Sequence, residues 1–241
     1  MKLSIVSNYT QLGKMAAQQV VDYVTCAPES CLVFPTGNTP LGMYRELVNA
    51  HKSGKVSFKG ESLVELDDYF GIPMDDSRNL FAWLGRTFID HVDISPGRLY
   101  RFNTNAADAS AEAARMDAAV RNAGGIGLLV LGLGPNGHIG FNEPGSDPDS
   151  PTRVVELTPE SLESNSDYWG KTAGVPARGI TLGMDLLLSA KKIILLVNGK
   201  HKAQILRQLV VGTETPLLPA SFLQRAADFT IIADTSAASL I

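Results

Sequence analysis

Residues 126–145 read IGLLVLGLGPNGHIGFNEPG, an apolar run that passes directly into a glycine-rich loop. The run is apolar at successive positions, which is typical of a strand buried on both faces of a parallel sheet. The first three glycines of the loop have the G-x-G-x-x-G spacing of a dinucleotide-binding turn. That turn requires a helix from the third glycine, and the prolines between residues 144 and 151 interrupt one. The stretch therefore predicts a parallel α/β sheet and gives only weak support for a nicotinamide or flavin cofactor.

Similar β-rich runs lie along the rest of the chain, and most lead through a loop into a helical pattern. Strands are expected at residues 3–7, 30–34, 62–66, 127–133, 192–198 and 229–234. Helices are expected at residues 11–24, 39–52, 79–92, 108–124 and 201–212. This alternation predicts a single Rossmann-like α/β domain over residues 1–241, with one doubly wound, mainly parallel sheet and helices on both faces. Functional side chains should then lie at the carboxyl ends of the strands.

The charge and the apolar runs exclude several kinds of partner. The chain of 241 residues has a formal net charge of −4 and no cluster of Lys or Arg, which argues against a nucleic-acid partner. No apolar run approaches the roughly 20 residues of a membrane span. The N-terminal residues MKLSIVSNYT are typical of a short strand and not of a secretory signal. We therefore expect a cytoplasmic protein with no membrane partner.

The glycine-rich loop carries Asn136, His138, Asn142 and Glu143. Glycines allow the backbone to come close to a ligand. An imidazole beside a carboxylate can act as a proton-transfer pair, in which the carboxylate orients the ring. A histidine that only holds the loop together would have the same spacing, and the loop alone leaves both interpretations open.

A second strand ends in the loop of VFPTGNTPLGMYRELV, residues 33–48. Thr39 suits the N-cap of the following helix and Pro40 its first position, while Gly37 and Asn38 tolerate a tight turn. The start of such a helix is an anion site that would accept a phosphate or a carboxylate. The loop lacks the Lys of a nucleotide-binding P-loop, which favours a small phosphorylated metabolite. The alternative is a helix that is merely well capped.

A third strand ends in LVELDDYFGIP, residues 63–73. Neighbouring residues of a strand point to opposite faces, so at most one of Asp67 and Asp68 should enter a site. A carboxylate there could remove a proton next to a carbonyl group. The alternative is a carboxylate that caps a helix or a turn.

The three motifs PTGNTP, LDDYFGIP and GLGPNGHIGFNEPG together resemble the glucosamine-6-phosphate deaminase (isomerase) family, over residues 12–234. The related phosphogluconolactonases share the fold and the loop with its histidine but lack GFNEPG. The resemblance implies an enzyme that converts glucosamine 6-phosphate and water to fructose 6-phosphate and ammonia. A galactosamine-6-phosphate deaminase that forms tagatose 6-phosphate is the alternative. A sugar-phosphate-binding regulator without catalysis is a remote one.

The resemblance also implies roles for individual residues. Asp67 matches the base that moves a proton from carbon 2 to carbon 1, His138 the residue that opens the sugar ring, and Glu143 the carboxylate that tunes it. Asn136 occupies a position that is Asp or Asn in this relay. The implied phosphate cradle consists of Thr36, Gly37, Asn38, Thr39 and Lys202. No metal or cofactor is implied, and the partner is the amino-sugar phosphate itself.

The chain departs from the family pattern in three places. Asp167 stands in the segment SNSDYW where many members carry an Arg that binds phosphate, within a lid expected around residues 150–182. The sequence around Arg178 looks more like the galactosamine branch, and Arg178 could supply a substitute cation. The sequence ends at AASLI, short of the tail that helps form the allosteric site of hexameric members. We expect a monomer or a small homo-oligomer and leave allosteric activation open.

Overall fold

The computed structural model describes residues 1–170 and 174–241. Within these residues, seven strands form one sheet in which every pairing is parallel. In spatial order they are β1 (Lys2–Val6), β10 (Phe229–Asp234), β9 (Lys192–Val197), β6 (Leu128–Gly132), β2 (Cys31–Phe34), β3 (Ser62–Glu65) and β5 (Leu99–Tyr100). The predicted parallel α/β sheet is therefore confirmed.

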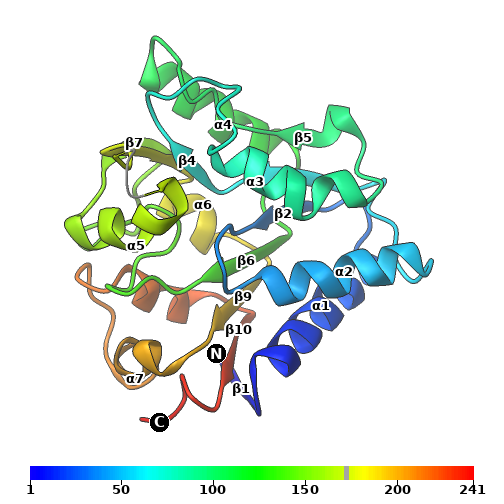
Figure 1. Ribbon diagram of the computed structural model, residues 1–241, viewed down its shortest axis with the longest axis vertical. Helices are drawn as coiled ribbons and strands as arrows, with labels where there is room; N and C mark the ends of the chain where they lie inside the picture. Colours follow the sequence, from blue (N-terminus) through cyan, green and yellow to red (C-terminus); the bar gives the residue numbers. More distant parts are fainter. Residues whose placement is uncertain (171–173) are drawn as a thin grey trace.

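Helices cover both faces of this sheet (Figure 1). The α-helices are α1 (Tyr9–Cys26), α2 (Leu41–Lys52), α3 (Leu80–Thr87), α4 (Ala109–Asn122), α5 (Pro159–Trp169), α6 (Met184–Leu188) and α7 (Ala203–Val211). Short 3-10 helices are η1 (Ile89–His91), η2 (Pro96–Arg98), η3 (Lys200–Lys202) and η4 (Pro219–Arg225). None of the helices in the described chain combines the length and the apolar character needed to cross a membrane.

Alternate residues of each strand divide the core into two layers. Leu32 and Phe34 of β2 pack with α1, α2 and α3, whereas Cys31 and Val33 pack with α4, α6 and α7 on the opposite face. Both sets of side chains are almost completely buried. This burial explains why the strands are apolar at successive positions, because neither face meets water.

The strand order reverses between β2 and β6. From β2 the chain builds outward through β3 to β5, and it then returns to add β6 on the other side of β2, followed by β9 and β10. In doubly wound sheets, ligands bind at the carboxyl ends of the strands beside such a reversal. The topology therefore favours a site between the loops that follow β2 and β6.

A smaller antiparallel sheet, which the sequence did not predict, adjoins this edge. Among the described residues it consists of β4 (Asp67–Tyr69), β8 (Arg178–Thr181) and β7 (Arg153–Glu156). The predicted strand 62–66 ends at Glu65, and after Leu66 the chain enters β4. This step from one sheet to the other carries the acidic pair of LDDY away from the parallel sheet and toward the reversal point.

Candidate active site

A cavity of about 320 Å³ lies at the carboxyl ends of the central strands. The loops after β2, β3, β6 and β9 contribute its walls, and α5 adds side chains from above the loops. Its polar lining includes Thr36, Asn38, Thr39, Asp67, His138, Ser164, Asn165, His201 and Lys202. The structure thus brings together side chains from all three sequence motifs, which lie more than 60 residues apart at their furthest.

The loop after β2 presents unused backbone donors beside this cavity. Gly37 has a φ of +97°, in the left-handed region that favours glycine. The backbone amides of Gly37, Asn38 and Thr39 donate to no acceptor within the part of the chain that the structure describes. Consecutive amides in a turn form a concave site for an anion. The loop is therefore suited to hold a phosphate group.

The cap of α2 differs from the prediction. Pro40 precedes the first helical residue, and no side chain of the loop caps the helix. The Tyr9 hydroxyl, from α1, accepts the amide of Gly42 at 2.9 Å. The Thr39 hydroxyl instead donates to Asn198 Oδ1 at 2.8 Å and ties the loop after β2 to the loop after β9. The predictions of Thr39 as N-cap and Pro40 as the first helical residue were wrong, because a distant tyrosine caps the helix.

Lys202 lines the same cavity from η3. Burial lowers the pKa of its ammonium group to about 8. No carboxylate among the described residues forms an ion pair with it, so a bound anion would be its charge partner and would favour the protonated form. His201 reaches the cavity from the same turn. In the sequence, His201 is only the first residue of the helix expected at residues 201–212.

Asp67 and Asp68 point to opposite sides of β4, as the alternation of a strand predicts. Asp67 lines the cavity, whereas Asp68 Oδ1 accepts the amides of Tyr69 at 2.7 Å and Leu80 at 2.8 Å. Leu80 begins α3, whose N-cap is Asn79, so Asp68 adds a second acceptor at the helix start, in line with the capping alternative for the pair. One acid enters the site, and the other holds the first turn of a helix.

The environment of Asp67 makes its carboxyl group a strong proton acceptor. The residue is 6% exposed, and no described residue donates a hydrogen bond to its carboxylate. Burial, assisted by the negative charge of Asp68, raises the pKa of Asp67 to about 8. A carboxylate with so high a pKa can take a proton from carbon at a pH near neutral.

The glycine-rich loop does not have the structure of a dinucleotide-binding turn. No helix begins at Gly137, and the next helix along the chain is α5. Gly134 instead makes room for an imidazole ring, because a Cβ atom there would lie 2.2 Å from Cδ2 of His138. The glycine spacing thus serves the seating of His138, and the dinucleotide alternative lacks its structural requirement.

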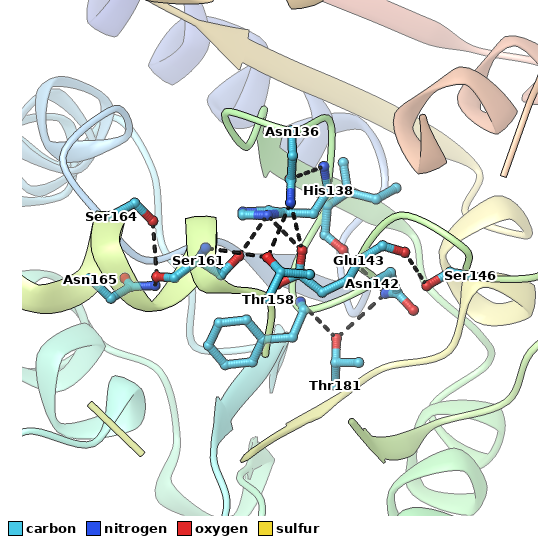
Figure 2. Close-up of polar contacts among 12 residues, drawn as sticks. Asn136, His138, Asn142, Glu143, Ser146, Thr158, Ser161, Ser164, Asn165 and Thr181 are labelled. Atoms are coloured by element: carbon cyan, nitrogen blue, oxygen red, sulfur yellow. Dashed lines mark hydrogen bonds and ion pairs between the residues drawn. The ribbon is translucent and has the colours of Figure 1, made fainter. Parts of the chain in front are cut away.

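His138 and Glu143 form a buried pair at the end of this loop (Figure 2). His138 Nδ1 lies 3.3 Å from Glu143 Oε2. Asn136 Nδ2 donates to the same carboxylate oxygen at 3.0 Å, and Asn136 Oδ1 accepts the backbone amide of His138 at 3.2 Å. Asn136 therefore fixes both members of the pair, which is the geometry of an oriented acid–base couple.

Glu143 stays ionised in this setting. Burial pushes the pKa of its carboxyl group upward, but the hydrogen bond and charge of His138, with hydrogen bonds from Ser161 and Asn136, outweigh burial and lower the pKa to about 2. The carboxylate accordingly accepts hydrogen bonds only, and it turns a protonated nitrogen of His138 toward itself.

The structure does not bring Arg178 to the cavity. Its guanidinium carbon lies 5.3 Å from the ring centre of Phe70, and the residue is exposed on the smaller sheet. The expectation that Arg178 substitutes for the family's lid arginine therefore has no support in the geometry. The side chain of Asp167, and residues 171–173 of the segment before Arg178, lie outside what the structure describes.

Four polar side chains of α5 and its N-terminus were missed by the sequence analysis: Thr158, Ser161, Ser164 and Asn165. Ser164 and Asn165 line the cavity, while Thr158 and Ser161 contact the glycine-rich loop. Residues three and four apart share one face of a helix. The spacing of Ser and Asn within ESLESNSDYW indicates a polar helix face. It does not indicate which surface of the protein that face contacts.

The described side chains contain no group of three or more His, Cys, Asp or Glu residues that could hold a metal ion. The ionisable groups of the cavity are Asp67, His138, His201 and Lys202, with Glu143 behind His138. These groups can bind an anion and move protons.

A doubly wound sheet with ionisable side chains gathered at its reversal point defines an α/β enzyme. More particularly, the chain belongs to the family of glucosamine-6-phosphate isomerases and 6-phosphogluconolactonases, whose model matches residues 7–232.

Relatives within this family match the whole chain. It is 38% identical over 241 residues to a glucosamine-6-phosphate deaminase of Halothermothrix orenii, and the match covers 100% of both chains. It is 37% identical over 240 residues to glucosamine-6-phosphate deaminase 1 of Bacillus subtilis, covering 100% of this chain and 99% of that one.

Solved structures agree with these matches. A monomeric glucosamine-6-phosphate deaminase superposes with a TM-score of 0.97 at 37% identity, over 100% of both chains. A 6-phosphogluconolactonase from Thermotoga maritima has a TM-score of 0.76 at 19% identity, covering 97% of this chain and 98% of that one. The second likeness extends to the fold alone.

Proposed function

We propose that this protein is a glucosamine-6-phosphate deaminase, which converts glucosamine 6-phosphate and water to fructose 6-phosphate and ammonia. The observation that carries the proposal is one cavity that holds a buried carboxylate, a His–Glu pair and an anion-binding loop. The full-length relatives that bear this name support the choice of substrate.

The phosphate group of the substrate occupies the loop from Thr36 to Thr39 and pairs with Lys202. Three backbone amides of the loop have no other described acceptor, and the Lys202 ammonium has no described carboxylate partner. Charge-assisted hydrogen bonds of this kind are about twice as strong as neutral ones. The phosphate contacts therefore fix the sugar with its reactive carbons toward Asp67 and His138.

His138 opens the sugar ring. Its Nε2 edge lies against Gly134, which lines the cavity, while Nδ1 is turned toward Glu143. Nε2 takes the proton of the carbon 1 hydroxyl and returns a proton to the ring oxygen, so that the bond from carbon 1 to the ring oxygen breaks. Glu143 stabilises the imidazolium that forms between these transfers.

Asp67 then moves a proton between the two carbons. Its carboxylate removes the proton from carbon 2 of the open-chain aldehyde, and that electron pair forms a carbon 1–carbon 2 double bond. The π pair of the carbonyl group moves to oxygen 1, which takes a proton from the substrate's own ammonium group, so that an enolamine forms. The same carboxyl group returns the proton to carbon 1, which leaves an iminium at carbon 2. Water adds to that carbon and ammonia leaves, so the product is fructose 6-phosphate.

Three coarser expectations accompany this function. Residues 150–182, which include α5, act as a lid over the cavity, supported by Ser164 and Asn165 in its lining. The protein acts as a monomer or a small homo-oligomer, and the monomeric relative favours the former. It works in the cytoplasm, since a sugar phosphate is charged and does not cross membranes unaided.

Ammonia release from glucosamine 6-phosphate and from galactosamine 6-phosphate, measured side by side, tests the substrate. We expect kcat/KM to be higher for glucosamine 6-phosphate. The galactosamine alternative is not favoured, because the full-length relatives are named glucosamine-6-phosphate deaminases and because Arg178 lies against Phe70 outside the cavity. A higher kcat/KM for the galactosamine epimer would overturn the choice of substrate, and no ammonia from either would overturn the function.

A further inference from the structure

Ser161, which lies 18 residues beyond Glu143 in the chain, places a hydroxyl group beside the His–Glu pair. The residue is fully buried in the first turn of α5, and its Oγ lies 3.1 Å from His138 Nδ1. Glu143 Oε2 approaches the same nitrogen at 3.3 Å, so the hydroxyl and the carboxylate meet at Nδ1. Figure 2 shows Ser161 reaching across from α5 toward His138.

The contacts of α5 hold this hydroxyl in place. The amide of Ser161 donates to Oγ1 of Thr158 at 3.3 Å, which caps the start of the helix. Thr158 Oγ1 in turn accepts Nδ2 of Asn136 at 3.3 Å. The first turn of α5 is therefore bound to the glycine-rich loop at two points, Thr158 to Asn136 and Ser161 to His138.

The hydrogen atoms available determine how the three groups pair. The Glu143 carboxylate has no hydrogen to give, and a serine hydroxyl has one. A ring nitrogen that faces this carboxylate oxygen at 3.3 Å must therefore carry the hydrogen, and the Ser161 oxygen beside it is a second acceptor. Both oxygens near Nδ1, at 3.1 and 3.3 Å, then require a hydrogen on that nitrogen.

A hydrogen on Nδ1 leaves the lone pair of the neutral ring on Nε2. No residue in the described chain hydrogen-bonds Nε2, which lies at the ring edge packed against Gly134 in the cavity lining. A base that is to take a proton from a sugar hydroxyl needs its lone pair on that edge. The contacts at Nδ1 therefore orient the imidazole ring, and they lie on the side of the ring opposite Nε2.

We infer that Ser161 is a positioning residue that joins Glu143 in accepting the hydrogen of His138 Nδ1 and fixes the Nδ1-protonated form of the imidazole, so that α5 completes the acid–base pair of the loop. The inference rests on the proposed function, because it assigns to His138 a proton transfer at Nε2. It also makes a spectroscopic claim that does not depend on any substrate.

Ser161→Ala tests the inference, with Ser166→Ala as the matched control. Ser166 lies on the same helix, is half-buried, and bonds only the carbonyl of Glu163 at 2.8 Å. Loss of the Ser161 hydroxyl beside His138 Nδ1 should lower kcat for glucosamine 6-phosphate about tenfold, with KM changed less than about twofold. The control should keep both constants within about twofold of the unchanged protein.

Nitrogen-15 NMR of the histidine rings supplies the second readout, with His138 identified by the signal missing in His138→Gln. At a pH where the ring is neutral, the unchanged protein should show His138 protonated at Nδ1. Ser161→Ala should shift this signal and Ser166→Ala should not. Protonation at Nε2 in the unchanged protein would overturn the inference, and so would a Ser161→Ala variant that matches the control in kcat and in the spectrum.

The two claims fail in different ways. If the unchanged protein releases no ammonia from glucosamine 6-phosphate, the proposed function fails, whatever the spectrum shows. If it releases ammonia but carries the proton on Nε2, the role of Ser161 fails and the function stands. The NMR result for the unchanged protein decides the matter even if Ser161→Ala does not fold.

Discussion

Asp67→Asn should abolish catalysis and at the same time stabilise the fold. The Asp67 carboxyl group is buried beside Asp68, and its pKa is raised from 3.8 to about 8. At pH 7 the unfolded chain gains free energy by ionising this group, whereas in the folded protein only about a tenth of it is ionised, and that fraction acts as the base. At 1.36 kcal/mol for each pH unit, this difference destabilises the fold at pH 7 by up to about 4 kcal/mol. An asparagine of the same shape removes that cost.

The sign of the effect defines its pH dependence. A carboxyl group whose pKa is raised in the folded state adds stability below its unfolded pKa, and that stability is lost as the pH rises toward 8. The gain from Asp67→Asn should therefore be small at pH 4, grow up to about pH 8 and then level off. Urea unfolding at pH 4, 6, 7 and 9 measures it directly.

Asp75→Asn is the matched control, because Asp75 is exposed and forms no hydrogen bond or ion pair with the described residues. Its unfolding free energy and its turnover should stay close to those of the unchanged protein. Turnover of Asp67→Asn should fall at least about 10²-fold, as expected for loss of a general base. An Asp67→Asn variant that is active, or whose stability follows that of Asp75→Asn at every pH, would refute the reasoning.

Three further substitutions test the rest of the site. Lys202→Ala removes a charge-assisted contact to phosphate worth roughly 1.5–3 kcal/mol, so KM should rise more than about tenfold. Lys200 is exposed, and Lys200→Ala should leave KM unchanged. Equal KM values for the two variants in steady-state assays would place the phosphate elsewhere. Gly134→Ala introduces a Cβ atom 2.2 Å from His138 Cδ2, so kcat should fall at least about tenfold. The circular dichroism spectrum should show that the fold is retained. An undiminished kcat would contradict the position of the His138 ring against Gly134. The pKa of Glu143 is lowered to about 2, so this group adds stability above pH 4.5 that is lost as the pH falls toward 2. Glu143→Gln should therefore reduce the loss of unfolding free energy between pH 4.5 and pH 2, and it should lower kcat. An unchanged pH dependence of the unfolding free energy in this range would exclude the ionised pair.

Much of the site was predictable because strand periodicity and the helix-breaking effect of proline act on neighbouring residues of the chain. The alternation of a strand predicted that one of Asp67 and Asp68 enters the site, and the structure confirms it. The prolines after the glycine-rich loop predicted that no helix begins at Gly137, and none does.

The errors and omissions have a common physical origin in contacts between distant segments. Thr39 has the right chemistry for an N-cap, but a hydroxyl from Tyr9, 30 residues earlier, takes that role. Ser161 looks like an ordinary polar residue of a surface helix until α5 is placed over the loop of His138. Local sequence patterns do not show which surfaces of the molecule come into contact. The roles of Tyr9 and Ser161 could therefore be recognised only from the structure.

The ratio of products tests the central claim most directly. Purified protein given glucosamine 6-phosphate should release ammonia and form fructose 6-phosphate in equal amounts, with Asp67→Asn inactive in the same assay. Absence of ammonia, fructose 6-phosphate formed without ammonia, or equal release by Asp67→Asn would contradict the account.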